Sequence, residues 1–148
     1  MRLSDTTRTD CRADMVVDTS ALVAVLWKEP EGVPFLEAIQ ATHLRRMSAA
    51  TFVESSIVVE KKRGAEGVRE LDAFLTTALI EVVAVDARQA QVARRAYTVY
   101  GKGRHRAALN YGDCFSYALA TTLGEPLLFK GDDFGHTDVE PVDVSSSS

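Results

Sequence analysis

Short runs of β-branched residues alternate with helical segments along this chain, and no other feature of the sequence constrains the fold as much. The clearest strand is IEVVAV at residues 80–85, since β-branched residues favour extended backbone. Asp86 is then placed to cap a helix that runs through Tyr100 and ends at Gly101. Strands that alternate with helices in this way indicate an α/β protein in which helices flank a mainly parallel central sheet.

Caps, breakers and apolar runs predict the remaining elements. Ser48 is a candidate N-cap for a helix that runs to about Arg63, where Gly64 closes it. Residues 110–112 introduce a further helix over residues 113–123. The other predicted strands are 15–17, 44–47, 127–129 and 139–144, and the other predicted helices are 20–28, 34–41 and 67–78.

The 148 residues, of which 46% are hydrophobic, fit one domain that buries its core without disulfide or metal support. Residues 1–14 are polar and aperiodic, so we expect a flexible N-terminal extension upstream of a natural start at Met15. The folded domain is then residues 15–144, and residues 145–148 form a disordered tail. No apolar run approaches the ~20 residues of a membrane helix, and the two cysteines fit free thiols, so a cytoplasmic location is expected.

Acidic residues fall at the positions that a parallel sheet brings together. Asp18 ends the first predicted strand, Glu54 lies in the first turns of the helix after the second strand, and Asp113 opens a helix in NYGDC. Asp132 and Asp133 directly follow the strand LLF. Strand C-termini and the helix N-termini that follow them share one edge of such a sheet, where ligands bind. We therefore expect carboxylates from four segments to converge in one crevice.

Converging carboxylates repel one another unless a cation lies between them. Oxygen ligands without His or Cys favour Mg²⁺, with Mn²⁺ as a substitute, over zinc. The three histidines and two cysteines of the chain fit no zinc spacing. A Mg²⁺ held by few carboxylates keeps several waters, and one of these can become the nucleophile in an attack on a phosphate.

Each acid taken singly also fits a structural role. Asp18 and Asp113 suit the N-termini of helices, and Asp132 suits a turn. Glu54 is the acid that capping explains least. Its neighbours in the sequence are mostly apolar, so we expect Glu54 to face a partly buried surface, with a solvent-facing position as the alternative. The joint placement of the acids favours the metal site over these separate roles.

The formal net charge of −4 alone argues against a nucleic-acid partner, but the charge is unevenly distributed. Residues 94–106 contain no acid, two tyrosines and one histidine, and they carry five cations: Arg94, Arg95, Lys102, Arg104 and Arg106. Cations with interleaved rings suit single-stranded nucleic acid, through phosphate contacts and base stacking. A solvated helix end is the alternative, since cations favour helix C-termini. Beside an acidic metal site, RNA contact is the favoured interpretation.

Four motifs follow one another along the chain: MVVDTSALVAVL, SAATFVES, NYGDCFSYALA and PLLFKGDDF. In this order and spacing they resemble the PIN-domain ribonucleases, and more narrowly the VapC toxins of bacterial toxin–antitoxin pairs. The resemblance covers residues 15–144 and implies a PIN-like three-layer α/β sandwich. It implies a Mg²⁺-dependent endoribonuclease that cleaves tRNA or other structured RNA with a metal-activated water. It further implies a homodimer, and a cognate VapB-type antitoxin whose tail blocks the site.

The resemblance also assigns roles by motif, and it gives metal-centred catalytic roles to Asp18, Glu54 and Asp113. Ser20 matches the small hydroxyl residue of the first motif, which orients a ligand or a water. Many relatives carry the fourth acid in a TxDxxF pattern, and this chain has Gly131 at the matching place. Asp132 is therefore our choice for the fourth acid, with Asp133 as the alternative.

Three other functions fit parts of the pattern less well. A catalytically inactive PIN-like module would bind RNA without cutting it. A receiver-type phospho-signalling domain also uses acids and a lysine, here Asp18 and Lys130, but the paired acids before the phospho-acceptor are missing. A haloacid-dehalogenase-like phosphatase requires DxD, and this chain has Ser20 at the third position.

Overall fold

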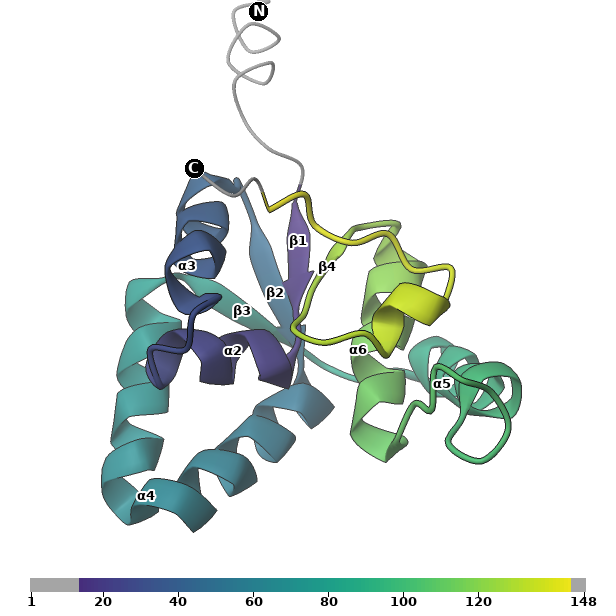
Figure 1. The fold of residues 1–148 in the computed structure, drawn as a ribbon, viewed down its shortest axis with the longest axis horizontal. Helices are drawn as coiled ribbons and strands as arrows, with labels where there is room; N and C mark the ends of the chain where they lie inside the picture. The colour runs from purple at the N-terminus through teal and green to yellow at the C-terminus, as the bar shows by residue number, and fades with distance from the viewer. Residues whose placement is uncertain (1–13, 145–148) are drawn as a thin grey trace, which may run out of the picture.

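The computed structural model describes residues 14–144, which form a central sheet of four parallel strands (Figure 1). The strands are β1 (Met15–Val17), β2 (Arg45–Ser48), β3 (Ile80–Val83) and β4 (Leu127–Leu128). Their order in the sheet is β3-β2-β1-β4, and every pair of neighbouring strands is parallel. Because each strand reaches the next through a helix, all four strands end at the same edge of the sheet.

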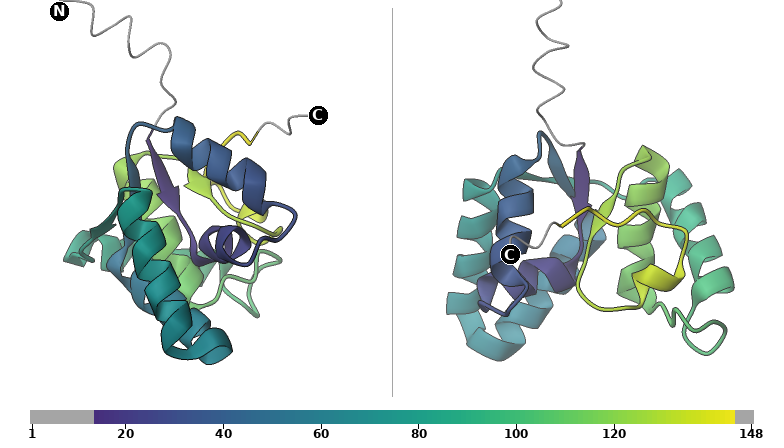
Figure 2. Two further views of the ribbon diagram at one scale, coloured as in Figure 1. Left: turned by 90° about the vertical axis from the view of Figure 1, so that its left-hand side faces the viewer. Right: turned by 45° about the horizontal axis from the view of Figure 1, so that its top comes forward.

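Helices cover both faces of this sheet, so the predicted three-layer α/β sandwich is confirmed (Figures 1 and 2). On one face lie α2, α3 and α4, whereas α6 covers the other face with α5 packed against it. A short 3₁₀ helix, η1, follows β4. The bounds of the helices are α2 (Thr19–Leu26), α3 (Gly32–Ala41), α4 (Ala49–Thr77), α5 (Ala87–Tyr100), α6 (Tyr111–Leu123) and η1 (Phe134–His136).

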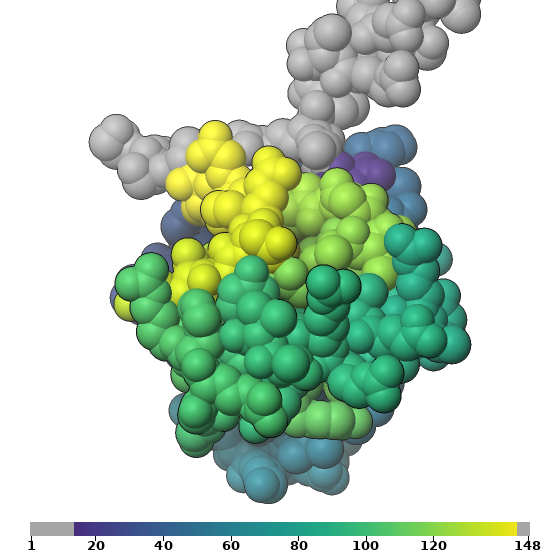
Figure 3. Space-filling model, turned by 90° about the vertical axis from the view of Figure 1, so that its right-hand side faces the viewer, coloured from purple at the N-terminus to yellow at the C-terminus, as the bar shows by residue number. Residues whose placement is uncertain are grey.

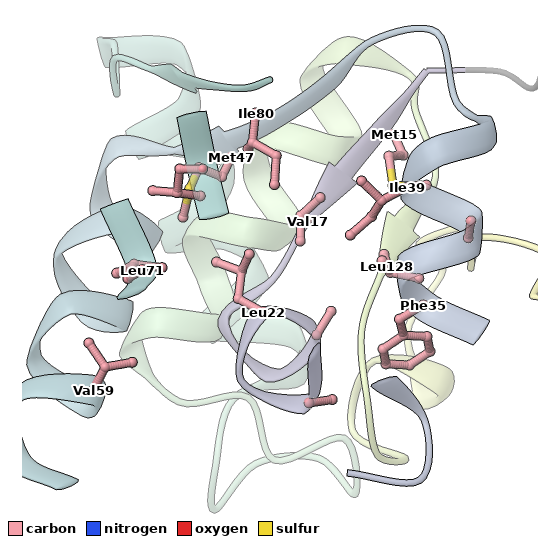
Figure 4. Close-up of a cluster of buried hydrophobic side chains, with 14 residues drawn as sticks. Met15, Val17, Leu22, Phe35, Ile39, Met47, Val59, Leu71, Ile80 and Leu128 are labelled. Carbon is pink, nitrogen blue, oxygen red and sulfur yellow. The ribbon is translucent and has the colours of Figure 1, made fainter. Parts of the chain in front are cut away.

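The alternation of side chains along β1 divides the core between the two faces. Met15 and Val17 point into the cluster under α2, α3 and α4, which Figure 4 shows together with Leu22 and Ile39. Val16 points the opposite way, into the cluster formed with α5 and α6. All three side chains of β1 are buried, as expected of a central strand that is covered on both faces. This buried strand ends next to Asp18, the first residue of the candidate site.

Most predicted boundaries lie within two residues of the observed ones. Gly64 interrupts α4 with φ 64° and ψ −151°, so the predicted break between two helical segments is confirmed. The helix predicted over residues 113–123 begins two residues earlier, because Asn110 rather than a later residue is its N-cap. The helix predicted to run through Tyr100 is confirmed, with Asp86 accepting a hydrogen bond from the Gln89 N–H.

The strand predicted over residues 139–144 is wrong. The segment makes one isolated bridge, between Leu127 and Pro141. Two backbone hydrogen bonds flank it, from the Leu127 N–H to the Glu140 oxygen and from the Val142 N–H to the Leu127 oxygen. Proline has no N–H to continue a ladder, so pairing stops there. The segment nevertheless covers the β4 edge of the sheet.

Several expectations concern residues outside the described range. The predicted extension, apart from Asp14, and the predicted tail over residues 145–148 lie there, as does Cys11. The domain limits of 15 and 144 stay predictions. Within residues 14–144, Cys114 is a free, buried thiol, and no helix is long and apolar enough to cross a membrane.

Candidate active site

Asp18 stands where β1 ends and α2 begins, and the residue as a whole is 3% exposed. Its Oδ2 accepts hydrogen bonds from the Ser20 N–H at 3.0 Å and the Ser20 hydroxyl at 2.8 Å. Its Oδ1 accepts from the Ser116 hydroxyl at 2.5 Å, although Ser116 lies on α6, 98 positions later. Asp18 is therefore a helix cap, and its carboxylate is also fixed at the edge where the strands end.

A buried chain of two hydroxyl groups is hydrogen-bonded to the Asp18 carboxylate. Ser116 Oγ lies 3.1 Å from Thr51 Oγ1, in the first turn of α4, and both side chains are fully buried. Ser116 has one hydroxyl proton and gives it to Asp18, so Thr51 is the donor to Ser116. The chain Thr51–Ser116–Asp18 thus ties α4 and α6 to the end of β1. Ser116 and Thr51 were not predicted from the sequence, although Ser116 lies three residues after Asp113, on the same face of α6.

Glu54 approaches the same edge from α4. Its Oε1 accepts the Thr19 hydroxyl at 2.7 Å, and Thr19 Oγ1 in turn lies 2.9 Å from the buried Ser55 hydroxyl. Burial raises the pKa of Glu54, the hydrogen bond from Thr19 opposes that rise, and the charge of Asp18 adds to it. Glu54 is therefore a half-buried carboxylate that is repelled by the negative charge of Asp18.

Gly112 allows α6 to begin against the Glu54 carboxylate. A Cβ built on Gly112 would lie 2.3 Å from Glu54 Oε2 and 2.6 Å from its Cδ. Real Cβ atoms essentially never approach so closely, and the atoms in contact are the end of the flexible Glu54 side chain, so a larger residue would displace the Glu54 carboxylate. The glycine of the NYGDC motif is thus explained by the approach of this carboxylate.

Asp113 lies in the first turn of α6 and forms a capping box with Asn110. The Asn110 side-chain oxygen accepts the Asp113 N–H at 2.8 Å, and Asp113 Oδ2 accepts the Asn110 N–H at 3.0 Å. Burial raises the pKa of Asp113 from its ordinary 3.8 to about 7, against the lowering effect of the Asn110 hydrogen bond. The charges of Asp18, Glu54 and Asp133 add to this rise. Four carboxylates from separate segments therefore act on one another at this edge.

The acids after β4 lie on an exposed loop beside these three carboxylates. Asp132 and Asp133 are both exposed, and Gly131 before them adopts a positive φ of 100°. The Lys130 N–H donates to the Ser20 hydroxyl at 2.9 Å, which ties the start of this loop to the first motif. The Ser20 hydroxyl thus joins two site segments. Of the two acids, Asp133 is the one whose charge raises the pKa of Asp113.

The chemistry of these donors fits a hard divalent cation. The side chains are carboxylates with hydroxyl supports, and the raised pKa values of Glu54 and Asp113 reflect burial and mutual repulsion that a cation would relieve. Within residues 14–144, no three His, Cys, Asp or Glu side chains lie close enough together to hold a metal ion directly. Small movements of the carboxylates, or bridging waters of the kind that Mg²⁺ retains, are therefore required for binding.

The five predicted RNA-binding cations do not form one continuous stripe. Arg94 and Lys102 line a cavity of about 510 Å³ between α5 and α6, whereas Arg95 lines a different cavity of about 390 Å³. The Arg104 guanidinium lies 5.7 Å from the centre of the Tyr97 ring. Arg106 is exposed in the loop before α6. Arg94 and Lys102 line the same cavity as Asn110, the N-cap of α6 whose side chain binds the Asp113 N–H.

Two other polar side chains have structural explanations. The Cys114 thiol donates to the main-chain oxygen of Asn110. Burial, followed by the charge of Asp113, raises the pKa of Cys114 to about 11. Such a thiol is not a nucleophile at neutral pH. The Lys130 ammonium pairs with Glu29 at 2.7 Å and Glu31 at 3.5 Å. Lys130 is thus bound to acids other than Asp18, which argues against a receiver-type domain.

Comparison with known proteins adds family relationships to this geometry. The family model described as PIN domain matches residues 15–140. The chain is 57% identical to Ribonuclease VapC30 of Mycobacterium tuberculosis over 128 residues, which cover 86% of this chain and 98% of that protein.

Solved structures share the fold at lower sequence identity. VapC20 of Mycobacterium tuberculosis, a toxin that cleaves the sarcin–ricin loop, matches with a TM-score of 0.64 and 18% identity, over 86% of this chain and 99% of that one. VapBC2 of Rickettsia felis, bound to a DNA fragment from its promoter, matches with a TM-score of 0.69 and 18% identity, over 88% of this chain and 97% of that one.

Proposed function

This chain belongs to the VapC ribonuclease family of PIN-domain proteins, and on that basis we propose that its active site is the sheet edge where Asp18, Glu54 and Asp113 meet. One observation carries the proposal: Asp18, Glu54 and Asp113 come from three separate segments and meet at this edge, where Ser116 of α6 binds Asp18 and Gly112 of α6 lies against Glu54. Burial, and then the charges of Asp18, Glu54 and Asp133, raise the pKa of Asp113. Gathering like charges at one edge costs folding free energy, and a nuclease that holds a cation requires such a cluster.

We propose a Mg²⁺-dependent reaction, with Mn²⁺ as a substitute, in which Asp18 and Asp113 hold the cation and Glu54 and an acid after β4 complete the site. When bound, a divalent cation supplies an activated water and neutralises charge on the phosphodiester. The chain itself presents Asp18 in one orientation, since the Ser20 and Ser116 hydroxyls occupy both carboxylate oxygens. Preorganisation of this kind lowers the cost of orienting charge during the reaction.

The fourth acid is one of the two after β4. The motif pattern favours Asp132, and the electrostatic effect on Asp113 supports Asp133. Separate Asp132→Asn and Asp133→Asn variants decide between them, because the acid that belongs to the site lowers the cleavage rate more when its charge is removed.

The substrate that we propose is tRNA or another structured RNA, cut within the chain. Arg94, Lys102, Arg104 and Arg106 lie on the segment that leads into α6 and would contact phosphates, since each cation next to a phosphate releases a counterion. Because cellular RNA is the substrate, the cytoplasm is the proposed place of action.

We also propose that the protein is the toxin of a VapBC-type pair, acts as a homodimer and is inhibited by a cognate VapB-type antitoxin. The support is the family relationship, together with a structural relative that is itself a VapBC assembly. An antitoxin that blocks the site must cover a surface that holds both carboxylates and cations.

The proposed activity is tested by mapping cleavage of total cellular RNA with purified protein in Mg²⁺. We expect discrete cleavage by the wild type, loss of cleavage in EDTA, and loss of cleavage in Asp113→Asn. Asp72→Asn is the matched control, because Asp72 is an exposed acid on α4 whose loss removes the same charge. Full activity of Asp113→Asn, or undiminished activity in EDTA, contradicts the proposal. RNA binding by the wild type without cleavage would instead support the inactive RNA-binding module.

A further inference from the structure

A cavity of about 510 Å³ opens between α5, the loop that follows it, and the first turns of α6. Figure 3 shows this face of the molecule, on which α5 and the loop lie in front. The volume lies within the range of sites for small molecules. Its walls include three aromatic rings and three polar side chains: Tyr97, Tyr111, Phe115, Arg94, Lys102 and Asn110.

One ring on these walls is unusually accessible. Tyr111 is 79% exposed, which is high for so large a side chain in a folded domain. Its ring lies edge-on to Phe115, with centroids 4.9 Å apart and an interplanar angle of 72°. On the opposite wall Tyr97 is 39% exposed. A flat apolar ligand that enters the cavity would therefore meet the exposed ring of Tyr111, and it would share the Tyr97 ring with the Arg104 guanidinium.

The cavity adjoins the proposed active site through one residue. Asn110 lines the cavity, and the same side chain accepts the Asp113 N–H in the capping box. Cys114, the neighbour of Asp113, also lines it. A ligand in the cavity would thus lie next to the turn that positions the Asp113 carboxylate.

From this arrangement we infer that the cavity is a subsite for one nucleobase of the RNA strand, next to the phosphodiester that is cut. The inference rests on the proposed function. The aromatic rings would stack on the base, which is sequence-tolerant because every base presents a π-face. Arg94 and Lys102 at the same cavity would contact the phosphates on either side of that base.

Charge distinguishes this occupant from a second copy of the chain. Two copies that met at this face about a twofold axis would bring the same surface together. Such a contact would gather Arg94 and Lys102 of both copies in one interface, and like charges in an interface oppose association. An RNA strand supplies the opposite charge together with the ring that the walls fit.

The test measures RNA affinity and cleavage for variants of Tyr111. Affinity is measured by fluorescence anisotropy of a labelled single-stranded RNA of mixed sequence in EDTA, so that cleavage does not interfere. We expect Tyr111→Ala to weaken binding about tenfold, and Tyr111→Phe to bind like the wild type because it keeps the ring. Leu123→Ala is the matched control, since Leu123 is an exposed apolar residue at the other end of α6.

Cleavage in Mg²⁺ separates this inference from the proposed function. We expect Tyr111→Ala to raise the KM about tenfold and to leave kcat within about twofold, because the subsite holds substrate and does not touch the reacting atoms. Wild-type affinity and KM in Tyr111→Ala would overturn the subsite while the Asp113-dependent activity stood. Absence of cleavage by the wild type would refute the proposed function, and the anisotropy measurement would still test the subsite.

Oligomeric state is the remaining readout. Light scattering of wild type and Tyr111→Ala is expected to give the same mass. A lower mass for Tyr111→Ala, with unchanged affinity for RNA, would show that a second copy covers the cavity and would overturn the nucleobase assignment.

Discussion

Replacing Asp113 by asparagine is expected to abolish RNA cleavage and, at the same time, to stabilise the metal-free fold. Asparagine keeps a side-chain oxygen that can accept the Asn110 N–H, so the cap of α6 is retained. What it removes is a charge that burial and three neighbouring carboxylates disfavour. The gain in stability follows from the removal of that charge.

The direction in which the free energy of unfolding changes with pH, and the pH range of that change, follow from the pKa of Asp113. This pKa is raised from 3.8 to about 7 in the folded state. Below pH 3.8 the group is protonated in both the folded and the unfolded chain, so it contributes nothing. Between 3.8 and 7 the unfolded chain loses the proton and the folded chain keeps it, so stability falls as pH rises. Above pH 7 Asp113 is ionised in both states, so the loss of stability that it causes is complete.

The size of the effect is bounded by the same two pKa values. Each pH unit between them corresponds to about 1.4 kcal/mol, which gives an upper bound of about 4 kcal/mol. Asp113 is only partly buried, so solvent screening reduces the effect, and we expect about 2 kcal/mol.

Urea unfolding of the wild type and Asp113→Asn, in EDTA at a series of pH values, measures this difference. We expect the two proteins to have nearly equal free energies of unfolding near pH 4, and the variant to be more stable by the full amount near pH 8. Addition of Mg²⁺ should narrow the gap by stabilising the wild type. A variant that is less stable than the wild type near pH 8 would refute the argument, because Asp113 would then stabilise the metal-free fold as a charged group.

Three further predictions concern packing and the support of the site. Gly112→Ala should lower the cleavage rate about a hundredfold with the far-ultraviolet circular dichroism unchanged, because the new Cβ displaces Glu54; near-normal cleavage would contradict the contact. Ser116→Ala should reduce the free energy of unfolding by about 1–3 kcal/mol in urea, because Asp18 loses a buried donor; an unchanged midpoint would count against the hydroxyl chain. Leu71→Ala should cost about 2–5 kcal/mol in the same assay without altering the cleavage products, since Leu71 is fully buried.

Elements with a strong local signal could be predicted from the sequence. Asp86 caps α5, and Gly64 breaks α4, because in both cases one residue type has a conformational preference that its neighbours cannot override. The predicted strand over residues 139–144 failed because its apolar residues carry no information about pairing. Pro141 limits that segment to one bridge with Leu127, and only the tertiary structure shows which edge it meets.

The convergence of Asp18, Glu54 and Asp113 could also be predicted, because a parallel sheet places the ends of its strands at one edge. The hydroxyl groups that hold them could not. Ser116 lies 98 positions from Asp18 and 65 from Thr51, and serine and threonine occur at many buried and exposed positions. Only the packing of α6 against α4 and β1 brings these three side chains into contact.

The hydrogen bonds of Asp18 also determine when conformational entropy is lost. Both of its oxygens are fixed by Ser20 and Ser116, so the rotamer freedom of this carboxylate is lost when the chain folds. Asp132 and Asp133 lie exposed on a loop, and under the proposed function their rotamer freedom would be lost only when the cation binds. A tighter loop at these two acids would therefore raise affinity for a cation through entropy alone, without any new contact.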